Sequence, residues 1–368
     1  MAAAIFSGLF LLAAAQDVSR KATIRSASPA PDLDARFAFA QGWLGADGIY
    51  SVTLPRKRTV WLFSDTWIGV LKDGRRAPTD MINNSIGITE GSGPAHFYYR
   101  GKDGQAAALF TPVDGRGWFW LWAGVLDGRR LFLFAIRVES AEGPGAFGFA
   151  HFRTALGEVE NPRDNPTAWR VRWRDMPAAW EPRVFWGSSA LARDGFVYVF
   201  GFIENKKKGL EFQRDMLVAR VPSGELADFA AWRFYGNGAW HADVRQAERI
   251  CPGVATEYSV TYIPSRRRFL LVTHDFFLSP TIVARTADHP WGPWSEMTKL
   301  YDCPEADAKR GVFCYAAKHQ PVFSDADTLV ISYAANAGDM ETVVNDPSLY
   351  VPRFIRVPMA LVFSERRP

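Results

Sequence analysis

The sequence predicts an all-β protein that folds as a five-bladed β-propeller. Hydrophobic residues make up 48% of the 368 residues and aromatic residues 14%, which is typical of a globular chain. Short apolar runs separated by tight turns recur along the chain, with no heptads and no long amphipathic helical pattern. The same strand–turn–strand unit appears five times, about 60 to 80 residues apart. A pair of β-sandwiches, the alternative, would not need five similar units.

The first 15 residues are small and apolar and end in Ala13-Ala14-Ala15. This run is too short to span a membrane and resembles a signal peptide cut after Ala15, although no Lys or Arg precedes it. We therefore expect a periplasmic or secreted protein. Residues 16–41 would form a leader and residues 42–368 a single propeller domain.

The first blade is predicted from Trp43 to about Thr89, with strands over 48–54, 59–64 and 84–89. Turn residues over 55–57 separate the first two strands. The stretch 45–52 places one carboxylate, Asp47, between two glycines in an apolar strand. A propeller places such a strand next to its axis, so we expect Asp47 to point into the central funnel.

The second and third blades each begin with a long apolar strand that ends in a hairpin turn. In the second blade, strands over 118–126 and 131–135 flank Asp127-Gly128. In the third, strands over 184–191 and 196–201 flank Asp194-Gly195. Asp-Gly between two apolar runs is a strong hairpin signal.

The last two blades repeat the unit with less regular turns. The fourth has strands over 255–262, 268–273 and 281–286, and the fifth has strands over 315–323 and 328–333. A final strand near 353–357 completes the chain. The predicted inner strand of the fourth blade carries the second acid of interest, Glu257.

Two carboxylates from different blades would face each other across the funnel, because the innermost strands converge there. Glycosidic cleavage needs such a pair, one as acid and one as base or nucleophile. Burial beside Tyr258 would raise the pKa of Glu257 and suit it as the acid. Asp47, among glycine backbone groups, would stay ionised and activate water. The alternative is that both acids cap strands or bind backbone amides.

Five other side chains are candidates for binding a sugar, and each has a structural alternative. Asp65 would orient a group in the site or hold a loop, and Asn83 would contact hydroxyls or form a turn. His319 would orient a carboxylate or bind substrate, or else be a satisfied core histidine. Trp122 and Trp186 would stack on sugar rings or pack between blades.

The three cysteines give no metal-binding pattern, and no nucleotide, flavin or serine-hydrolase motif is present. In an oxidising compartment Cys303 and Cys314 would form a disulfide and leave Cys251 free. We therefore predict no cofactor and no catalytic metal, and a structural Ca²⁺ in the funnel is left open.

The formal net charge is +4. Its basic clusters, over 206–208 and 266–268, look like solvated hairpin turns rather than a nucleic-acid-binding face. We expect neither a nucleic-acid partner nor a membrane span.

Several stretches together resemble a bacterial propeller family described as domain of unknown function 4185 and its neighbours. They are residues 45–52, 61–69, 81–88, 186–191, 257–262, 282–295, 318–324 and 329–336, and the resemblance spans about 42–357. That family resembles the five-bladed arabinanases, xylosidases and invertase-like hydrolases, and some members are endo-D-arabinanases. The resemblance implies that Asp47 is base or nucleophile and Glu257 the general acid. Blade two departs from the pattern, because Ala123 stands where a relative would offer a carboxylate.

The leading hypothesis is therefore an exported glycoside hydrolase that cleaves a polysaccharide, furanosidic and arabinan-like. The second hypothesis is a non-catalytic carbohydrate-binding propeller. The third is a scaffold propeller whose funnel is plugged by apolar side chains.

Overall fold

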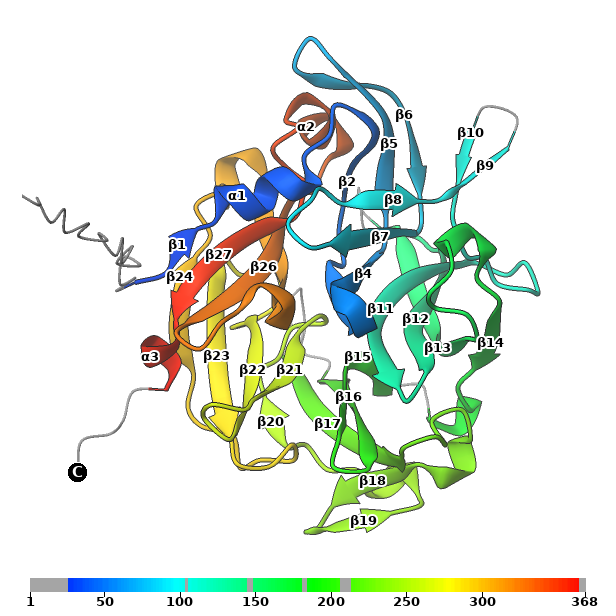
Figure 1. Ribbon diagram of the computed structural model, residues 1–368, viewed down its shortest axis with the longest axis vertical. Helices are drawn as coiled ribbons and strands as arrows, with labels where there is room; N and C mark the ends of the chain where they lie inside the picture. Colours follow the sequence, from blue (N-terminus) through cyan, green and yellow to red (C-terminus); the bar gives the residue numbers. More distant parts are fainter. Residues whose placement is uncertain (1–25, 103–104, 144–147, 181–183, 206–212, 364–368) are drawn as a thin grey trace, which may run out of the picture.

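Figure 1 shows the computed structural model, which has antiparallel sheets arranged around a common centre. It describes residues 26–102, 105–143, 148–180, 184–205 and 213–363. The predicted signal peptide and the cluster 206–208 lie outside the described residues. Within the described part, five sheets of four or more strands follow one another along the chain, as the blades of a β-propeller do.

Each blade is an antiparallel sheet whose first strand in the chain is the innermost. The outermost strand of the fifth blade comes from the N-terminal part of the chain. Blade one contains β3 (Tyr50–Leu54), β4 (Arg58–Phe63), β7 (Ser85–Glu90) and β8 (His96–Tyr98). Blade two contains β11 (Trp118–Asp127), β12 (Arg130–Ser140), β13 (Phe149–Val159) and β14 (Val171–Asp175). Blade three contains β15 (Val184–Arg193), β16 (Phe196–Asn205), β17 (Gln213–Pro222), β18 (Arg233–Gly236), β19 (Ala239–His241) and β20 (Cys251–Pro252).

The last two blades are built in the same way. Blade four contains β21 (Ser259–Ile263), β22 (Arg268–His274), β23 (Thr281–Ala287) and β24 (Thr298–Asp302). Blade five contains β25 (Val312–His319), β26 (Thr328–Ala337), β27 (Arg353–Pro358) and β1 (Ser28–Pro29). A smaller sheet of β2 (Gln41–Ala46), β5 (Thr66–Lys72) and β6 (Arg75–Ile82) is inserted at blade one, and β9 (Arg100–Lys102) pairs with β10 (Gln105–Ala107). The α-helices are α1 (Pro31–Asp34), α2 (Met340–Asn345) and α3 (Met359–Val362).

The inner strands contact one another around the ring, and two further contacts tie the two ends of the chain together. Inner strand β11 packs against β3 and β15, β15 against β21, and β21 against β25. Between blades five and one, the Gln320 side chain accepts a hydrogen bond from Ser51 and donates one of 2.9 Å to the carbonyl of Ile49. The outer edge of blade five is covered by β1, which pairs with β27. The segment predicted as a leader thus packs on the propeller: the Ala30 N–H donates to the Phe354 carbonyl at 2.8 Å, and the Phe37 side chain is buried.

Inner strands of three blades share a bulge at a similar level. The bulges lie between Leu121 and Gly124 in β11, between Trp186 and Ser189 in β15, and between Tyr315 and Lys318 in β25. A bulge re-aims side chains and is common beside active sites. At Gly187 the bulge requires glycine, because φ is +100° and a Cβ would lie 2.5 Å from the Phe134 ring.

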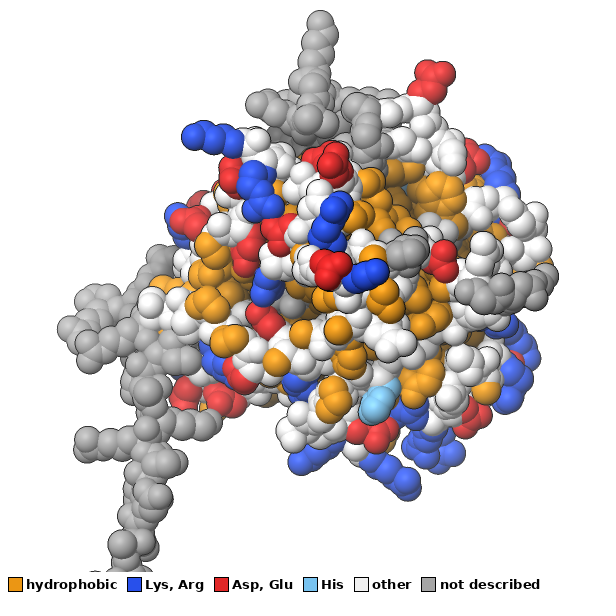
Figure 2. All heavy atoms as spheres, turned by 90° about the horizontal axis from the view of Figure 1, so that it is seen from above, with side chains coloured by type: hydrophobic (Ala, Val, Ile, Leu, Met, Phe, Trp, Pro, Cys, Tyr) orange, Lys and Arg blue, Asp and Glu red, His pale blue; other side chains and the backbone are white. Residues whose placement is uncertain are grey.

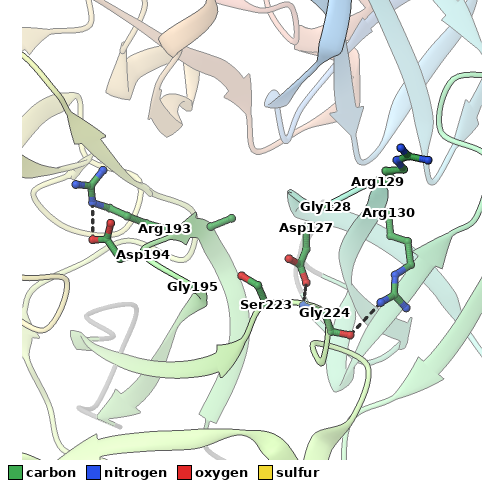
Figure 3. A pocket seen from close by; sticks show the side chains of 10 residues that line it. Asp127, Gly128, Arg129, Arg130, Arg193, Asp194, Gly195, Ser223 and Gly224 are labelled. Carbon is green, nitrogen blue, oxygen red and sulfur yellow. Dashed lines mark hydrogen bonds and ion pairs between the residues drawn. The ribbon is translucent and has the colours of Figure 1, made fainter.

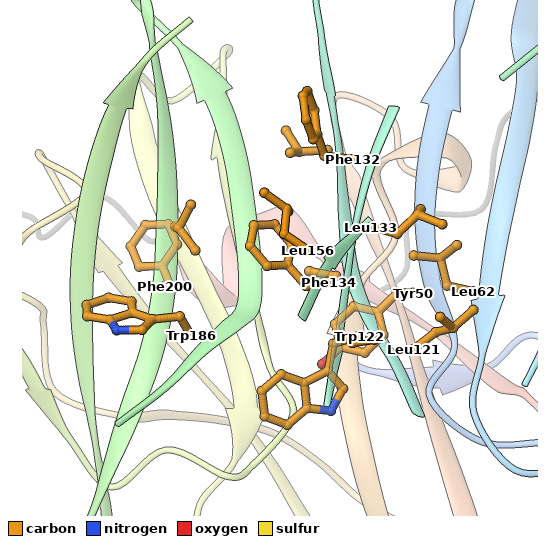
Figure 4. Close-up of a cluster of buried hydrophobic side chains, with 14 of the residues drawn as sticks. Tyr50, Leu62, Leu121, Trp122, Phe132, Leu133, Phe134, Leu156, Trp186 and Phe200 are labelled. Atoms are coloured by element: carbon orange, nitrogen blue, oxygen red, sulfur yellow. The ribbon is translucent and has the colours of Figure 1, made fainter. Parts of the chain in front are cut away.

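Large apolar side chains fill the space between neighbouring blades (Figure 4). Trp122 and Trp186 extend from the bulges of β11 and β15 into this core, among Leu121, Phe134 and Phe200. Their exposed fractions are 2% and 1%. The core thus fixes the blades to one another at the level of the bulges, directly beside the funnel.

The expected disulfide is not present. Cys251, Cys303 and Cys314 are all buried free thiols. Cys303 and Cys314 are nevertheless neighbours, with a hydrogen bond between their side chains. Burial, and then this hydrogen bond, raises the pKa of Cys303.

The described surface carries charges of both signs. Residues 264–267 form the exposed turn between β21 and β22, and Arg268, the first residue of β22, pairs with Asp288 at 3.0 Å. On the face in Figure 2, basic and acidic side chains are interspersed. No helix in the described part of the chain has the length and apolarity needed to cross a membrane.

Candidate active site

Three carboxylates gather around the start of the inner strands. Asp47 lies between β2 and β3, Asp65 between β4 and β5, and Glu257 directly before β21. The backbone of Asp47 donates to the carbonyl of Asp65 at 3.3 Å. Asp65 and Glu257 are both close enough to Asp47 to raise its pKa by electrostatic repulsion. The structure therefore brings together the two predicted catalytic acids and one predicted binding residue.

Asp47 is held by two tyrosines from distant parts of the chain. Its Oδ2 accepts hydrogen bonds from Tyr315 at 2.9 Å and Tyr350 at 3.1 Å. Its Oδ1 is buried and has no hydrogen-bond partner. Burial, followed by repulsion from Asp65 and Glu257, raises the pKa of Asp47 well above the ordinary carboxyl value. The expectation that Asp47 stays ionised assumed open glycine backbone around it, whereas the structure surrounds it with tyrosines and two other acids.

Asp65 has a more polar environment. Its Oδ1 accepts from the indole of Trp120 at 2.6 Å and from the amide of Asn83 at 3.1 Å. Burial raises the pKa of Asp65 to about 6, and these two hydrogen bonds limit the rise. Asp65 therefore supplies a third carboxylate from blade one, where blade two has Ala123. Asn83 holds this carboxylate, a role that sequence reasoning did not foresee.

Glu257 is paired with a buried lysine. Lys318 Nζ lies 3.1 Å from Glu257 Oε1, with exposed side-chain fractions of 2% and 13%. The ammonium also donates to the carbonyl of Ala316 at 3.0 Å and lies 4.1 Å from the centre of the Tyr50 ring. Burial lowers the pKa of Lys318, while Glu257 acts in the opposite direction. The contact joins the loop before β21 in blade four to β25 in blade five.

Backbone strain is concentrated around Asp47. Ile49, Ala316 and Tyr350 have φ values of 52°, 63° and 60°, although none is glycine and none lies in a hairpin turn. Ile49 is two residues from Asp47, Ala316 follows Tyr315, and Tyr350 bonds Asp47 directly. Non-glycine residues with positive φ persist where the surrounding structure over-determines them, which is often at functional sites.

The remaining candidates from the sequence, His319, Trp122 and Trp186, are buried in the core of the protein. His319 has both ring nitrogens bonded, Nδ1 with Thr261 at 2.8 Å and Nε2 with Ser324 at 3.0 Å, and burial lowers its pKa to about 3. This is the environment of a satisfied core histidine. Trp122 and Trp186 are buried in the core and present no face to a sugar ring. For these three residues the structure supports the packing alternative and corrects the predicted binding role.

Sequence reasoning missed four side chains that build the site: Lys318, Tyr315, Tyr350 and Trp120. Lys318 and Tyr315 flank the bulge of β25, which no sequence pattern revealed. Tyr350 lies in the loop after α2, outside any strand. Trp120 is in an apolar run of β11, where it looked like its neighbour Trp122.

Within the described residues, no group of three or more His, Cys, Asp or Glu side chains is arranged to hold a metal ion. A cavity of about 520 Å³ lies elsewhere, at the hairpin ends of β11 and β15 (Figure 3). It is lined by Asp127, four residues beyond Ala123, which is roughly 13 Å along an extended strand. Asp127 accepts from the backbone of Gly224 at 2.6 Å, and Arg193 pairs with Asp194 at 3.1 Å. Asp47, Asp65 and Glu257 are not among the residues that line this cavity.

Three solved structures are similar to this chain. A protein from Bacteroides ovatus that has been proposed to be a hydrolase matches with a TM-score of 0.72 and 16% identity, over 90% of each chain. An α-L-arabinofuranosidase from Lactobacillus brevis matches with a TM-score of 0.50 and 12% identity, over 86% of this chain and 90% of that one. A glycoside hydrolase from Xanthomonas citri, solved with xylotriose, has a TM-score of 0.46, 14% identity and coverage of 89% and 91%. No curated protein matches the chain in sequence.

The fold is that of an all-β propeller. The family model that matches is the domain of unknown function DUF5005, over residues 31–359. The chain belongs to this family. It is not the family suggested by the sequence resemblance, domain of unknown function 4185.

Proposed function

We propose that the protein is an exported glycoside hydrolase in which Asp47 and Glu257 cleave a glycosidic bond of a polysaccharide. The observation that carries the proposal is the contrast between these two acids. Asp47 is enclosed with neither a cation nor an N–H donor in contact, whereas Glu257 contacts the Lys318 ammonium. Acid and base assignments follow from pairs of groups whose environments drive their protonation apart.

These environments assign the roles in the opposite way from the sequence resemblance. Asp47 is the general acid, because burial and two neighbouring carboxylates raise its pKa and favour the protonated form. Its tyrosine partners both bind Oδ2, which leaves the proton to Oδ1, the buried oxygen without a partner. Glu257, in contact with the Lys318 ammonium, is the base or the nucleophile.

The reaction then follows the usual course of paired-carboxylate hydrolysis. As the bond from the anomeric carbon to the leaving oxygen breaks, Asp47 Oδ1 gives its proton to that oxygen. Glu257 either takes a proton from the attacking water or attacks the anomeric carbon itself; in the second case water then breaks the new bond from Glu257 to the sugar and gives its proton to Asp47. Asp65, through its repulsion of Asp47, favours the return of a proton to Asp47 after each turnover.

The substrate class, a furanosidic and arabinan-like polysaccharide, rests on the sequence resemblance. A panel of arabinans, arabinogalactans, fructans and xylans tests it, with reducing-sugar release as the readout. We expect release from at least one glycan by the wild-type protein and none above background by Asp47→Asn or Glu257→Gln. Asp194→Asn, in the hairpin turn between β15 and β16, is the matched control and should retain full activity. Release that survives both site substitutions would refute the proposal.

A second candidate, a non-catalytic carbohydrate-binding propeller, is favoured by one observation. Blade two offers only the buried Ala123 at the bulge of β11. This candidate predicts saturable retention on one glycan of the panel with no product. Asp65 argues for catalysis instead, because it provides a third carboxylate from a different strand.

A further inference from the structure

Arg76 is a buried arginine that binds a segment more than 260 residues away. It lies in β6, and 3% of it is exposed. Its guanidinium donates to four backbone carbonyls, those of Val343, Asp346, Pro347 and Leu349. The bond to Leu349 is 2.6 Å long and that to Asp346 is 3.2 Å. Two of the acceptors belong to the end of α2, where helix carbonyls lack partners of their own.

The segment that Arg76 holds ends at Tyr350. The backbone N–H of Tyr350 donates to Ala335 at 2.7 Å, and its hydroxyl donates to Asp47. Its carbonyl oxygen lies against Gly45, where a Cβ would approach to 2.2 Å. The segment is thus fixed between β2 and β26, one residue after the Leu349 carbonyl that Arg76 binds.

The charge of Arg76 is directed at this segment. Burial lowers its pKa to about 10, so the guanidinium remains protonated at neutral pH. The Asp346 carboxylate instead pairs with Arg310 at 2.6 Å. A planar guanidinium fork can bind several carbonyls in fixed geometry, which an ammonium cannot.

We propose that Arg76 is a positioning residue: it holds residues 343–350 so that the Tyr350 hydroxyl stays bonded to Asp47 Oδ2. This inference rests on the proposed function, in which Asp47 is the proton donor. With Tyr315 and Tyr350 both on Oδ2, Oδ1 is the oxygen of Asp47 that is left to carry its proton. Arg76 acts through Tyr350 and does not itself touch Asp47.

Other groups also face Asp47, and the test leaves them unchanged. They are Tyr315 and Lys318 from β25, Tyr50 from β3, Asp65 after β4 and Glu257 before β21. Arg76 donates to none of them. A change in the pKa of Asp47 on substitution of Arg76 therefore reports the loss of Tyr350.

The experiment is a carboxyl ¹³C NMR titration of Asp47 without substrate, in protein labelled at the aspartate carboxyl carbons. The Asp47 signal is assigned by its absence in Asp47→Asn. Tyr350→Phe removes one donor to the carboxylate and should raise the pKa of Asp47 by about half a unit or more. Arg76→Met should raise it similarly, and the double variant should raise it no further. Arg130→Met is the matched control, because Arg130 also donates to a distant carbonyl, that of Gly224 at 2.9 Å.

An unchanged pKa in Arg76→Met, or additive shifts in the double variant, would overturn the proposal. Arg76→Lys keeps the charge but not the fork, and we expect an intermediate shift; it also serves if Arg76→Met does not fold. Because no substrate is present, a wild-type protein without turnover on any glycan refutes the proposed function but leaves this result standing.

Discussion

Lys318 and Glu257 form a buried ion pair across blades five and four, with 3.1 Å between Nζ and Oε1. The pair joins the end of β25 to the loop that precedes β21. It is also the only ammonium–carboxylate contact made by the three acids around the funnel in the described part of the chain. Its energetics give the first prediction.

Lys318→Met should destabilise the protein by about 2–4 kcal/mol, because it leaves the Glu257 carboxylate largely buried without a cation. The double variant with Glu257→Gln should recover most of that loss, since both charges are then absent. Urea unfolding of the wild type, both single variants and the double variant measures the coupling. Additive losses in the double variant would contradict a direct interaction.

Asp65→Asn should make the protein more stable relative to wild type as pH rises from 4 to 7. The pKa of Asp65 is raised to about 6 in the folded protein, against the ordinary value of 3.8 for an unfolded chain. Stability from such a group is complete below the unfolded pKa and is lost as pH rises through the folded pKa. The amide keeps an oxygen for Trp120 and Asn83 but has no charge to lose.

We expect this relative gain to reach about 1–3 kcal/mol at pH 7, which thermal unfolding at a series of pH values will measure. The same variant should lower the pKa of Asp47, because one source of repulsion is gone. A relative stability that does not change with pH would show that Asp65 is not desolvated.

Gly45→Ala should disrupt the contact between Tyr350 and Asp47. At this position φ is +151° and the new Cβ would lie 2.2 Å from the Tyr350 carbonyl oxygen. Gly74→Ala is the control, because Gly74 also has positive φ, +74°, but open space around it. We expect a larger loss of stability for Gly45→Ala and a large fall in kcat for that variant alone. Equal effects would show that backbone strain, rather than displacement of Tyr350, is responsible.

Trp186→Phe should cost stability without affecting substrate binding. The indole is 1% exposed among aromatic side chains, and its Nε1 has no hydrogen-bond partner to lose. The cavity left by the smaller ring should cost about 1–3 kcal/mol. Unfolding measurements and KM on the active glycan separate the two effects. A raised KM with unchanged stability would instead support a sugar-stacking role for Trp186.

The sequence predicted the propeller because strand periodicity and hairpin turns are local signals. Gly128 and Asp194-Gly195 lie in hairpin turns as predicted, whereas Asp47 and Glu257, predicted on inner strands, lie in the loops just before β3 and β21. The roles of individual side chains were not predicted, because they depend on contacts that the local sequence does not reveal. Trp120 and Trp122 are two residues apart in one strand, yet one bonds Asp65 and the other is core, because a bulge begins after Leu121.

The ionisation of the site could not be predicted either. The side chains that contact the two acids are distant in sequence. Tyr315 and Tyr350 are 268 and 303 positions from Asp47, and Lys318 is 61 positions from Glu257. Burial of one carboxylate and pairing of the other depend on these contacts between blades. A sequence pattern identifies the acids, whereas the contacts that distinguish them form only in the folded ring.

The central claim is that Asp47 donates a proton to the leaving group while Glu257 acts on the anomeric carbon. The most direct measurement compares Asp47→Asn and Glu257→Gln on two substrates with the same sugar: the active glycan and an aryl glycoside whose leaving group needs no protonation. We predict that Asp47→Asn loses roughly 10²–10⁴-fold in kcat on the glycan but retains most activity on the aryl glycoside. Glu257→Gln should lose activity on both. The reverse pattern, or full activity of either variant on the glycan, would contradict the account.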